Sequence, residues 1–471
     1  MISQGKPIQG GQAVSGVNQE SSCRKMRKRL NAPVHDGDRA ALVTLCLPHL
    51  PFHPSCFLGY GSAILAGTYD LDVIDLNAET HLRNVGKLKP ILDRMDKSPV
   101  VSDALLLHPF YEELGPHIDE EYEGISWEKY SLVYVTPPSW FPTVPTEAVL
   151  RLSGTIKRAS PNTRVRFVSN SLGSWTNEDQ LKKNGVEVAH LNSIGRRNPV
   201  QKPFNYDRLP TPFYQNRGKY MFDLLPFMLK HGCSWGRCRF CSLCRGWNSG
   251  YLERSAKAVI KEVAAVIDQH DPAALVCRDN SLKGRNLVEF CEYFRSFNKP
   301  WCGMSRADLS RAEIEALRKA GCRSIFFGLE SGSDRTLSAI NKGITSKQMS
   351  DFIKTLHSSG IAPAPSLMIG IPDEKPSDFE KTIQFLIDHR RYFDVVNVYP
   401  FIATPASEFG SQEKQLDKNV PLRLFRFIQT CEDLGLKVCV GEQCMEYFAF
   451  KWLLTCDIGS FYEMQENGAT S

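Results

Sequence analysis

Short apolar runs recur along the first half of the chain and alternate with segments long enough to form helices. The runs of buried-strand type are 41–47, 72–76, 131–135, 165–168 and 186–191. Alternation of strand and helix predicts a parallel, doubly wound α/β sheet. In such sheets ligands lie beyond the carboxyl ends of the strands. We therefore expect a Rossmann-like domain over residues 39–194.

A second alternating series begins at residue 220. Strands are expected at 224–229, 273–277, 301–304, 324–329, 364–369 and 395–399, with helices at 255–269, 287–297, 311–320, 346–359 and 376–389. About six βα units predict a partial (β/α)6 barrel over 220–415, whose active residues would lie at the carboxyl ends of the strands. The polar or glycine and proline residues at those ends are Asp279, Arg306, Glu330, Gly370 and Pro400.

The remaining segments lack this alternation. Residues 1–38 are polar and aperiodic, which predicts a disordered tail. Residues 195–219 are rich in proline and polar residues, which predicts a linker. Residues 416–471 carry helical patterns at 422–434 and 444–454, which predict a small helical C-terminal region.

Composition narrows the class of protein. The 471 residues are 42% hydrophobic and 23% charged, with a net charge of only +5, so specific nucleic-acid binding is not expected. No apolar stretch reaches the length of a membrane span, and no export signal opens the sequence, so we expect no membrane partner and a cytoplasmic location. In a reducing compartment the 15 cysteines are expected to be thiols and metal ligands.

Three cysteines carry the candidate chemistry. Cys233, Cys238 and Cys241 have the spacing C-x4-C-x2-C. Thiolates this close can converge on one metal site, and three of them can hold a [4Fe–4S] cluster with one iron left open. A structural zinc site, with Cys244 as its fourth ligand, is an alternative. Cys431, Cys439, Cys444 and Cys456 match no compact ligand pattern, which favours buried thiols over a second cluster.

This cysteine loop, with Phe240 before its third cysteine, resembles that of the radical S-adenosylmethionine (SAM) superfamily. Three later segments resemble further motifs of that family in the expected order: 328–334 with 340–345, 368–374, and 397–405. The resemblance covers roughly 220–415. The chain departs from the family pattern by one extra residue between the first two cysteines, and by Asp373 and Ala406 where glycine is usual.

The N-terminal half is similar to the cobalamin (B12)-binding domain of one branch of these enzymes, on the strength of residues 54–60 and 75–77. The D-x-H-x-x-G motif that supplies a histidine to cobalt is absent. Only His49 and His53 lie in the corresponding loop region. Residues 247–255 resemble cobalamin-type radical SAM proteins that modify ribosomally made peptides.

The resemblance implies roles for individual residues. Cys233, Cys238 and Cys241 would hold the cluster, and SAM would bind its open iron. Arg306 would bind the SAM carboxylate, Glu330 or Asp279 its amine, and Ser331 either group. Gly370 would contact the adenine, with Phe240 close to the same pocket. A surface ion pair is the alternative for Arg306, and ordinary turn chemistry for Asp279.

Three functions stay open at this point. The first is a radical SAM enzyme that cleaves SAM to a 5′-deoxyadenosyl radical for cobalamin-dependent C-methylation of a peptide or natural product. The second is a radical SAM enzyme with a vestigial B12 domain that carries out rearrangement, cyclisation or thioether chemistry. The third is a zinc-binding interaction module. Either enzyme would need an electron donor such as flavodoxin or ferredoxin and a small-molecule or peptide substrate.

Overall fold

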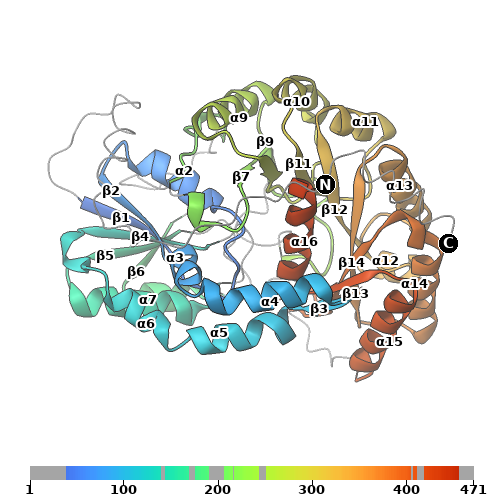
Figure 1. The fold of residues 1–471 in the computed structure, drawn as a ribbon, viewed down its shortest axis with the longest axis horizontal. Coiled ribbons are helices and arrows are strands. Elements are labelled where there is room, and N and C mark those ends of the chain that lie inside the picture. The colour runs from blue at the N-terminus through green and yellow to red at the C-terminus, as the bar shows by residue number, and fades with distance from the viewer. Residues whose placement is uncertain are drawn as a thin grey trace, which may run out of the picture.

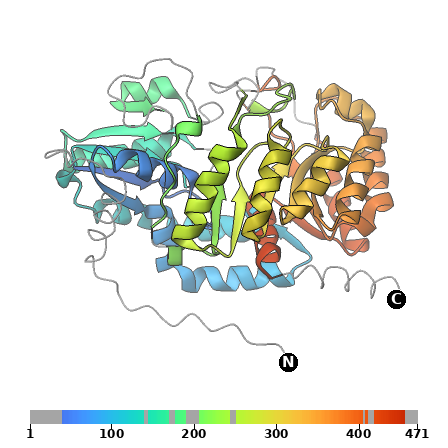
Figure 2. The same ribbon diagram turned by 90° about the horizontal axis from the view of Figure 1, so that it is seen from above.

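The computed structural model describes residues 39–138, 144–168, 176–189, 206–215, 217–242, 251–404, 407–410 and 418–455. The expected tail, Cys244, Ala406, Cys456 and residues 195–205 and 216 of the expected linker lie outside these residues. Two parallel sheets dominate the described residues and lie side by side in both views (Figures 1 and 2). None of the described helices is long and apolar enough to cross a lipid bilayer.

The N-terminal sheet has five parallel strands in the order β2-β1-β4-β5-β6. Its strands and the helices around it are β1 (Arg39–Thr44), α2 (Cys56–Leu65), β2 (Asp70–Asp75), α3 (Leu76–Arg83), α6 (His117–Glu123), β4 (Leu132–Thr136), α7 (Thr146–Ala159), β5 (Arg164–Val168), α8 (Glu178–Lys183) and β6 (Val186–Ala189). The chain reverses its direction of strand addition between β1 and β4, and such a switch point is where doubly wound sheets bind ligands. The expectation of a doubly wound fold is confirmed.

The second sheet has eight strands in the order β3-β15-β14-β13-β12-β11-β10-β7 and curls into a partial barrel (Figure 1). The six expected strands are β7 (Leu224–Phe227), β10 (Ala274–Cys277), β11 (Trp301–Ser305), β12 (Cys322–Glu330), β13 (Ala362–Ile369) and β14 (Val395–Pro400). The helices that alternate with them are α9 (Ala256–His270), α10 (Leu287–Phe294), α11 (Arg311–Lys319), α12 (Asp334–Ala339), α13 (Ser346–Ser358) and α14 (Pro376–His389). The predicted partial barrel is thereby confirmed.

Two further strands extend this barrel beyond the expected six. The C-terminal region consists of α15 (Val420–Asp433), β15 (Lys437–Val440) and α16 (Glu442–Thr455), so it is not purely helical. Strand β15 pairs with β14 on one side and with β3 (Val100–Ser102) on the other. Strand β3 comes from the N-terminal half, within the segment that also forms α4 (Val85–Lys97) and α5 (His108–Leu114). The expected boundary at residue 194 therefore does not separate the two sheets.

Helix α16 lies inside the curve of the barrel sheet and is held there by the N-terminal half (Figure 1). Asp103 accepts hydrogen bonds from the backbone N–H groups of Gln443 (3.0 Å) and Cys444 (2.8 Å). These bonds satisfy donors of the first helical turn that have no partner within the helix. A Cβ at Gly441 would lie 2.3 Å from Asp103 Cγ, so this contact requires glycine at the helix start.

Candidate active site

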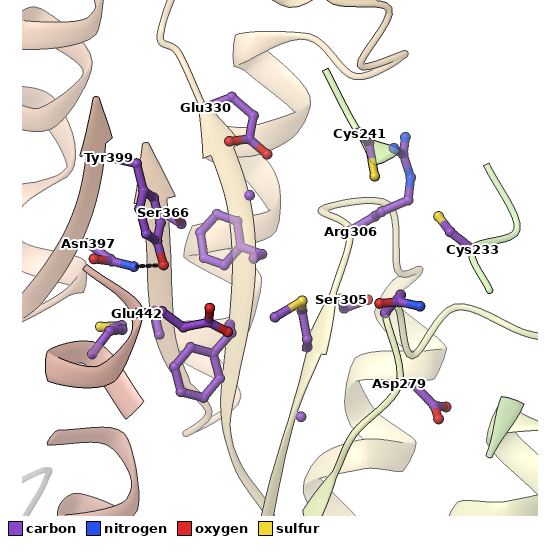
Figure 3. A pocket seen from close by; sticks show the side chains of 18 of the residues that line it. Cys233, Cys241, Asp279, Ser305, Arg306, Glu330, Ser366, Asn397, Tyr399 and Glu442 are labelled. Atoms are coloured by element: carbon purple, nitrogen blue, oxygen red, sulfur yellow. Dashed lines mark hydrogen bonds between the residues drawn. The ribbon is translucent and has the colours of Figure 1, made fainter. Parts of the chain in front are cut away.

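A cavity of about 480 Å³ opens at the carboxyl ends of the barrel strands. It is lined by all three motif cysteines, by strand-end residues of β10 to β14 and by α16 (Figure 3). Of the predicted site residues, those that line it are Cys233, Cys238, Phe240, Cys241, Asp279, Arg306 and Glu330, together with the strand-end residue Pro400. The barrel thus brings together residues that are far apart in the sequence.

The cysteine loop is fixed to the segment that follows β12. Trp235 Nε1 donates to the carbonyl oxygen of Asn341 at 2.9 Å, and its ring occupies the space where a side chain at Gly343 would be. The backbone N–H of Arg239 donates to Ile340, and its guanidinium donates to Ala339 at 2.8 Å. These contacts explain why the lysine–glycine pair at 342–343 accompanies the cysteine motif.

Arg306 lies directly beside the cysteines. Its Nη1 atom is 3.9 Å from Cys238 Sγ, its Nη2 atom donates to the carbonyl oxygen of Lys342 at 2.8 Å, and its guanidinium stacks over the Trp235 ring. Burial raises the pKa of Cys238 to about 11, while the positive charges of Lys342 and Arg306 favour the thiolate. Arg306 is not a surface residue, because only 5% of it is exposed.

Glu330 lies at the end of β12 and pairs with Lys342. The Lys342 Nζ atom is 2.7 Å from Glu330 Oε1, and both residues are buried. A Cβ at Gly328 would lie 1.9 Å from Glu330 Oε1 and 2.7 Å from Lys342 Nζ. Gly328 is therefore required for this ion pair to cross the strand end. Lys342 also lies over the ring of Phe240, which connects the pair to the cysteine loop.

Asp279 is buried at the end of β10 with one oxygen engaged. Its Oδ1 atom accepts from the backbone N–H groups of Leu229 (3.0 Å) and Lys230 (3.2 Å). Its Oδ2 atom has no hydrogen-bond partner among the described residues. Burial raises the pKa of Asp279 to about 6, although Lys230 favours its ionised form. A buried acceptor without a partner is costly, which favours a ligand contact over ordinary turn chemistry.

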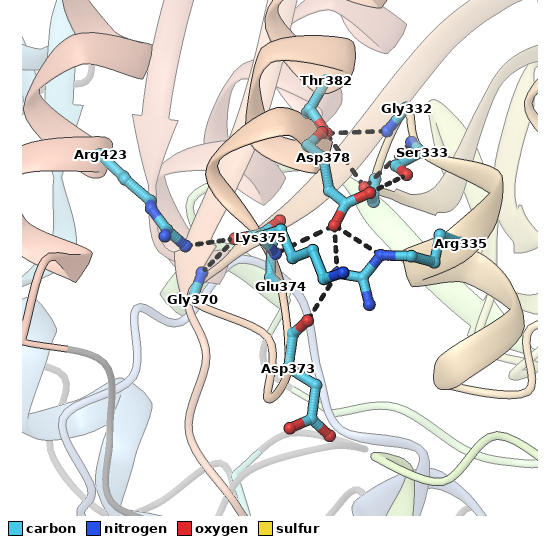
Figure 4. Close-up of polar contacts among 11 residues, drawn as sticks. Gly332, Ser333, Arg335, Gly370, Asp373, Glu374, Lys375, Asp378, Thr382 and Arg423 are labelled. Atoms are coloured by element: carbon cyan, nitrogen blue, oxygen red, sulfur yellow. Dashed lines mark hydrogen bonds and ion pairs between the residues drawn. The ribbon is translucent and has the colours of Figure 1, made fainter.

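Ser331 and Gly370 are not among the residues that line the cavity. Ser331 is buried and its hydroxyl lies 3.0 Å from that of Thr382 on α14. A Cβ at Gly370 would lie 2.2 Å from a methyl group of Val420, so this glycine makes room for α15. Both residues belong to a polar network that joins β12, β13, α14 and α15 (Figure 4).

Several pocket residues escaped the sequence analysis. They are Ser305, Ser366, Asn397 and Tyr399 on strands β11, β13 and β14, Lys342, and Glu442 and Glu446 on α16. Asn397 and Tyr399 alternate along β14, so they share one face of the strand. This alternation of polar residues along the strand could have identified both from the sequence. Nothing in the local sequence signals Glu442 or Glu446, because α16 reaches the barrel interior only through tertiary packing.

The loop after β1 contacts the barrel. His53 is 8% exposed, packs edge-on against Phe450 of α16, and its Nδ1 atom bonds to the carbonyl oxygen of Pro54. Burial lowers the pKa of His53 to about 3, so this imidazole is neutral. Gln443 accepts from the backbone N–H of Leu50 at 2.7 Å. The loop therefore joins the two sheets.

The arrangement of a cysteine loop across the mouth of a partial parallel barrel matches a known class of protein. Residues 229–386 match the family model of the radical SAM superfamily. The matched segment contains the three cysteines and most of the barrel strands, and similarity to this superfamily implies a [4Fe–4S] cluster and SAM as its ligand.

The sequence is also similar to that of individual methyltransferases. An uncharacterized methyltransferase of Pyrococcus horikoshii is 29% identical over 220 residues, which are 43% of this chain and 48% of that protein. The bacteriochlorophyllide d C-12(1)-methyltransferase of Chlorobaculum tepidum is 25% identical over 194 residues, 40% of this chain and 42% of that protein. The chain thus spans about half the length of the curated relatives it matches.

The fold extends over a longer stretch than these sequence matches. The radical SAM methyltransferase TsrM from Kitasatospora setae, solved with cobalamin and a [4Fe–4S] cluster bound, superposes with a TM-score of 0.57 at 14% identity. The superposition covers 79% of this chain and 77% of TsrM. The combination of a doubly wound sheet with a partial barrel is therefore that of a known radical SAM methyltransferase.

Proposed function

We propose that this protein is a radical SAM enzyme that methylates a carbon atom of a peptide or natural-product substrate with the aid of cobalamin. The observation that carries the proposal is the placement of Cys233, Cys238 and Cys241 on one loop that lines the barrel cavity. A [4Fe–4S] cluster with SAM on its open iron supplies reductive cleavage of the sulfonium to a 5′-deoxyadenosyl radical.

The residues around the cysteines fit this cluster. No three His, Cys, Asp or Glu side chains within the described ranges gather closely enough to hold a single metal ion, as a zinc site would need. A [4Fe–4S] cube instead binds each thiolate through a different iron, so its cysteine sulfur atoms can lie further apart than the ligands of a single metal ion. Arg306 and Lys342 place two positive charges next to Cys238, which stabilises thiolate ligands.

Each remaining polar group has a task in holding SAM. Arg306 would attract the carboxylate, because its guanidinium is fixed beside the cysteine loop by Asp308 and the Lys342 carbonyl. The free Oδ2 atom of Asp279 and the hydroxyl of Ser305 are buried acceptors without a partner in the described part of the chain. They would accept hydrogen bonds from the amine or the ribose. Phe240 and Met304 supply apolar surface that keeps water out.

Cobalamin is supported by the fold. It would lie at the switch point between β1 and β4, next to the barrel, and would supply methyl transfer. The His53 ring packs against Phe450 and its Nδ1 atom bonds to Pro54, so Nε2 is the ring atom that would have to ligate cobalt. The other candidate loops, 139–143, 169–175 and 190–205, lie outside the described residues. A vestigial N-terminal domain is the competing hypothesis, since the loop after β1 is occupied by contacts to α16.

The test compares Cys238→Ala with Cys291→Ala after anaerobic reconstitution with iron and sulfide. Cys291 is a buried thiol of α10 that does not line the cavity. We expect Cys238→Ala to lose the cluster absorption and at least ~100-fold in 5′-deoxyadenosine formation, since a cubane needs its cysteine ligands. Cys291→Ala keeps both. Deoxyadenosine formation at the unaltered rate in Cys238→Ala would refute the cluster assignment. Anaerobic purification with hydroxocobalamin, followed by absorption spectroscopy, separates methylation from the vestigial-domain hypothesis.

A further inference from the structure

The barrel cavity has a second end, which the cluster and SAM do not account for. On one side of Figure 3 lie Cys233, Cys241 and Arg306, and on the other lie Asn397, Tyr399 and Glu442. Asn397 is on β14, three strands away from Ser305 on β11 in the sheet order. Neighbouring strands are about 4.8 Å apart, so the path along the curved sheet from one side to the other is about 14 Å. We call the group formed by Asn397, Glu442 and Glu446 the acidic end.

Two buried acceptors at the acidic end lack a partner. Asn397 is 3% exposed, and its amide nitrogen donates to Tyr399 Oη at 2.6 Å. In this orientation of the amide, the carbonyl oxygen Oδ1 has no donor among the described residues. Glu446 is 7% exposed, and its Oε2 atom is likewise unpartnered in the described part of the chain. A buried, unpartnered acceptor costs about 1–3 kcal/mol unless a ligand satisfies it.

The acidic end carries one more negative charge than positive charge when its carboxyl groups are ionised. Glu442 and Glu446 are one helical turn apart on α16, so they face the same side. Arg278 pairs with Glu446 at 2.5 Å and also acts electrostatically on Glu442, so one positive charge faces two carboxyl groups. Asp103 lies close by, but its carboxylate is satisfied by two backbone N–H groups at the start of α16.

The remaining groups around Glu442 do not supply a positive charge. Burial lowers the pKa values of both His49 and His53, so neither ring is protonated near neutral pH. Desolvation and the Glu446 carboxylate raise the pKa of Glu442, against the effect of Arg278. A bound cation favours the ionised form of a carboxyl group whose pKa is raised, so a cationic ligand would stabilise the Glu442 carboxylate.

We propose that the acidic end is the recognition site for a protonated amine of the substrate, and that the substrate is an amine with an apolar or aromatic body. Glu442 supplies the counter-charge, while Asn397 Oδ1 and Glu446 Oε2 accept two of the ammonium N–H groups. The apolar body lies against the aromatic and thioether side chains of the cavity, which are Met304, Phe326, Phe327, Met445 and Phe450. The inference rests on the proposed function only in that it names the substrate class of the same pocket.

Binding of three probes of one shape tests this. Phenethylamine is a cation, phenethyl alcohol is neutral and 3-phenylpropionate is an anion. Their dissociation constants are measured by calorimetry on the anaerobically reconstituted full chain. We expect the amine to bind at least ~10-fold more tightly than the alcohol, and the anion most weakly, because the two carboxyl groups at this end share a single guanidinium.

Variants assign the preference to the acidic end. Glu442→Gln should reduce the preference for amine over alcohol to below ~3-fold, and Glu432→Gln, on the exposed face of α15, should leave it unchanged. Asn397→Asp keeps the side-chain shape and adds a carboxylate, so it should tighten amine binding alone. If Glu442→Gln fails to fold, the tighter amine binding expected for Asn397→Asp still tests the proposal.

The outcomes separate this proposal from the enzyme function. Four results would each overturn the amine site. The amine and the alcohol bind equally, the amine does not bind, the anion binds most tightly, or the preference for amine is unchanged in both pocket variants. Iron content and 5′-deoxyadenosine formation are measured on the same samples. Loss of those signals with the amine preference retained would sink the cluster assignment and leave the amine site standing.

Discussion

Three acidic residues of the barrel, Asp271, Glu330 and Asp373, hold backbone conformations that normally favour glycine. Glu330 has a φ of 62° and Asp373 a φ of 67°. At Glu330 the register of β12 against β13 shifts, and this bulge accompanies the turn of its carboxylate into the cavity toward Lys342. Asp373 is exposed, and its backbone oxygen accepts a hydrogen bond from Arg335 at 2.6 Å. The positive φ is the physical reason that glycine would be favoured at this position.

The Asp373 backbone predicts opposite effects for two substitutions. Asp373→Gly should leave the free energy of unfolding unchanged or raise it by up to ~1 kcal/mol, because glycine adopts positive φ without steric cost. Asp373→Val should lower it by about 1–2 kcal/mol, because a β-branched residue is disfavoured there. Asp351→Val, on the exposed face of α13, is the control with ordinary helical φ. Urea unfolding measures all three, and a valine penalty as small as that of the control would contradict the assignment.

At the scale of elements, one carboxylate joins the segment after β12 to the start of α14. Asp378 accepts hydrogen bonds from Ser333 Oγ (2.7 Å), Arg335 Nε (2.8 Å) and the backbone N–H of Lys375 (2.9 Å) (Figure 4). Burial by itself would raise the pKa of Asp378, but these donors outweigh it and lower the pKa to about 2. The ionised form is therefore the one that stabilises the fold.

This shift predicts a pH dependence of stability. Because the pKa of Asp378 is lower in the folded state than its ordinary value of about 3.9, its contribution is complete above pH ~4 and is lost as pH falls toward ~2. Asp378→Asn should cost about 1–2 kcal/mol at pH 6 and flatten the stability profile between those limits. Unfolding measured from pH 2 to pH 6 tests this, with Asp388→Asn on exposed α14 surface as control. Parallel profiles for wild type and Asp378→Asn would contradict it.

The same scale shows what the sequence could reveal of the fold. The six strands β7 and β10 to β14 were predictable, because each is an apolar run followed by a helix with a regular apolar face. Strands β3 and β15 have three and four residues, too short for any period to be recognised. Their pairing joins residues 100–102 to 438–440, and no local pattern encodes a contact over that distance.

For the site, sequence patterns were informative only where candidate residues coincide with strand ends. Asp279, Arg306 and Glu330 were predictable, since each follows an apolar strand of the barrel. Ser331 and Gly370 lie at strand ends too, but they turn away from the cavity and pack against α14 and α15. Glu442 was not predictable, because its place depends on Asp103 holding the first turn of α16 inside the barrel.

At the scale of the whole molecule, a buried polar group links the two sheets. Tyr60 on α2 donates its hydroxyl hydrogen to Glu262 on α9, and Arg254 pairs with the same carboxylate at 2.7 Å. The three residues are at most 4% exposed. Since each charged group here depends on its partner, the N-terminal half and the barrel are expected to unfold together.

Glu262→Ala is the variant that tests this coupling. It leaves the guanidinium of Arg254 buried without its counter-charge, and loss of one partner from a buried pair costs about 3–5 kcal/mol. Glu315→Ala removes a pair with Lys319 on the exposed side of α11 and should cost less than ~0.5 kcal/mol. Denaturant unfolding followed by near-UV circular dichroism should show one transition for wild type and Glu315→Ala. For Glu262→Ala we expect a lower midpoint or two separate transitions. If both variants lost an equal, small free energy of unfolding, the two sheets would be held together only by their apolar contacts and by the hydrogen bonds from the start of α16 to Asp103.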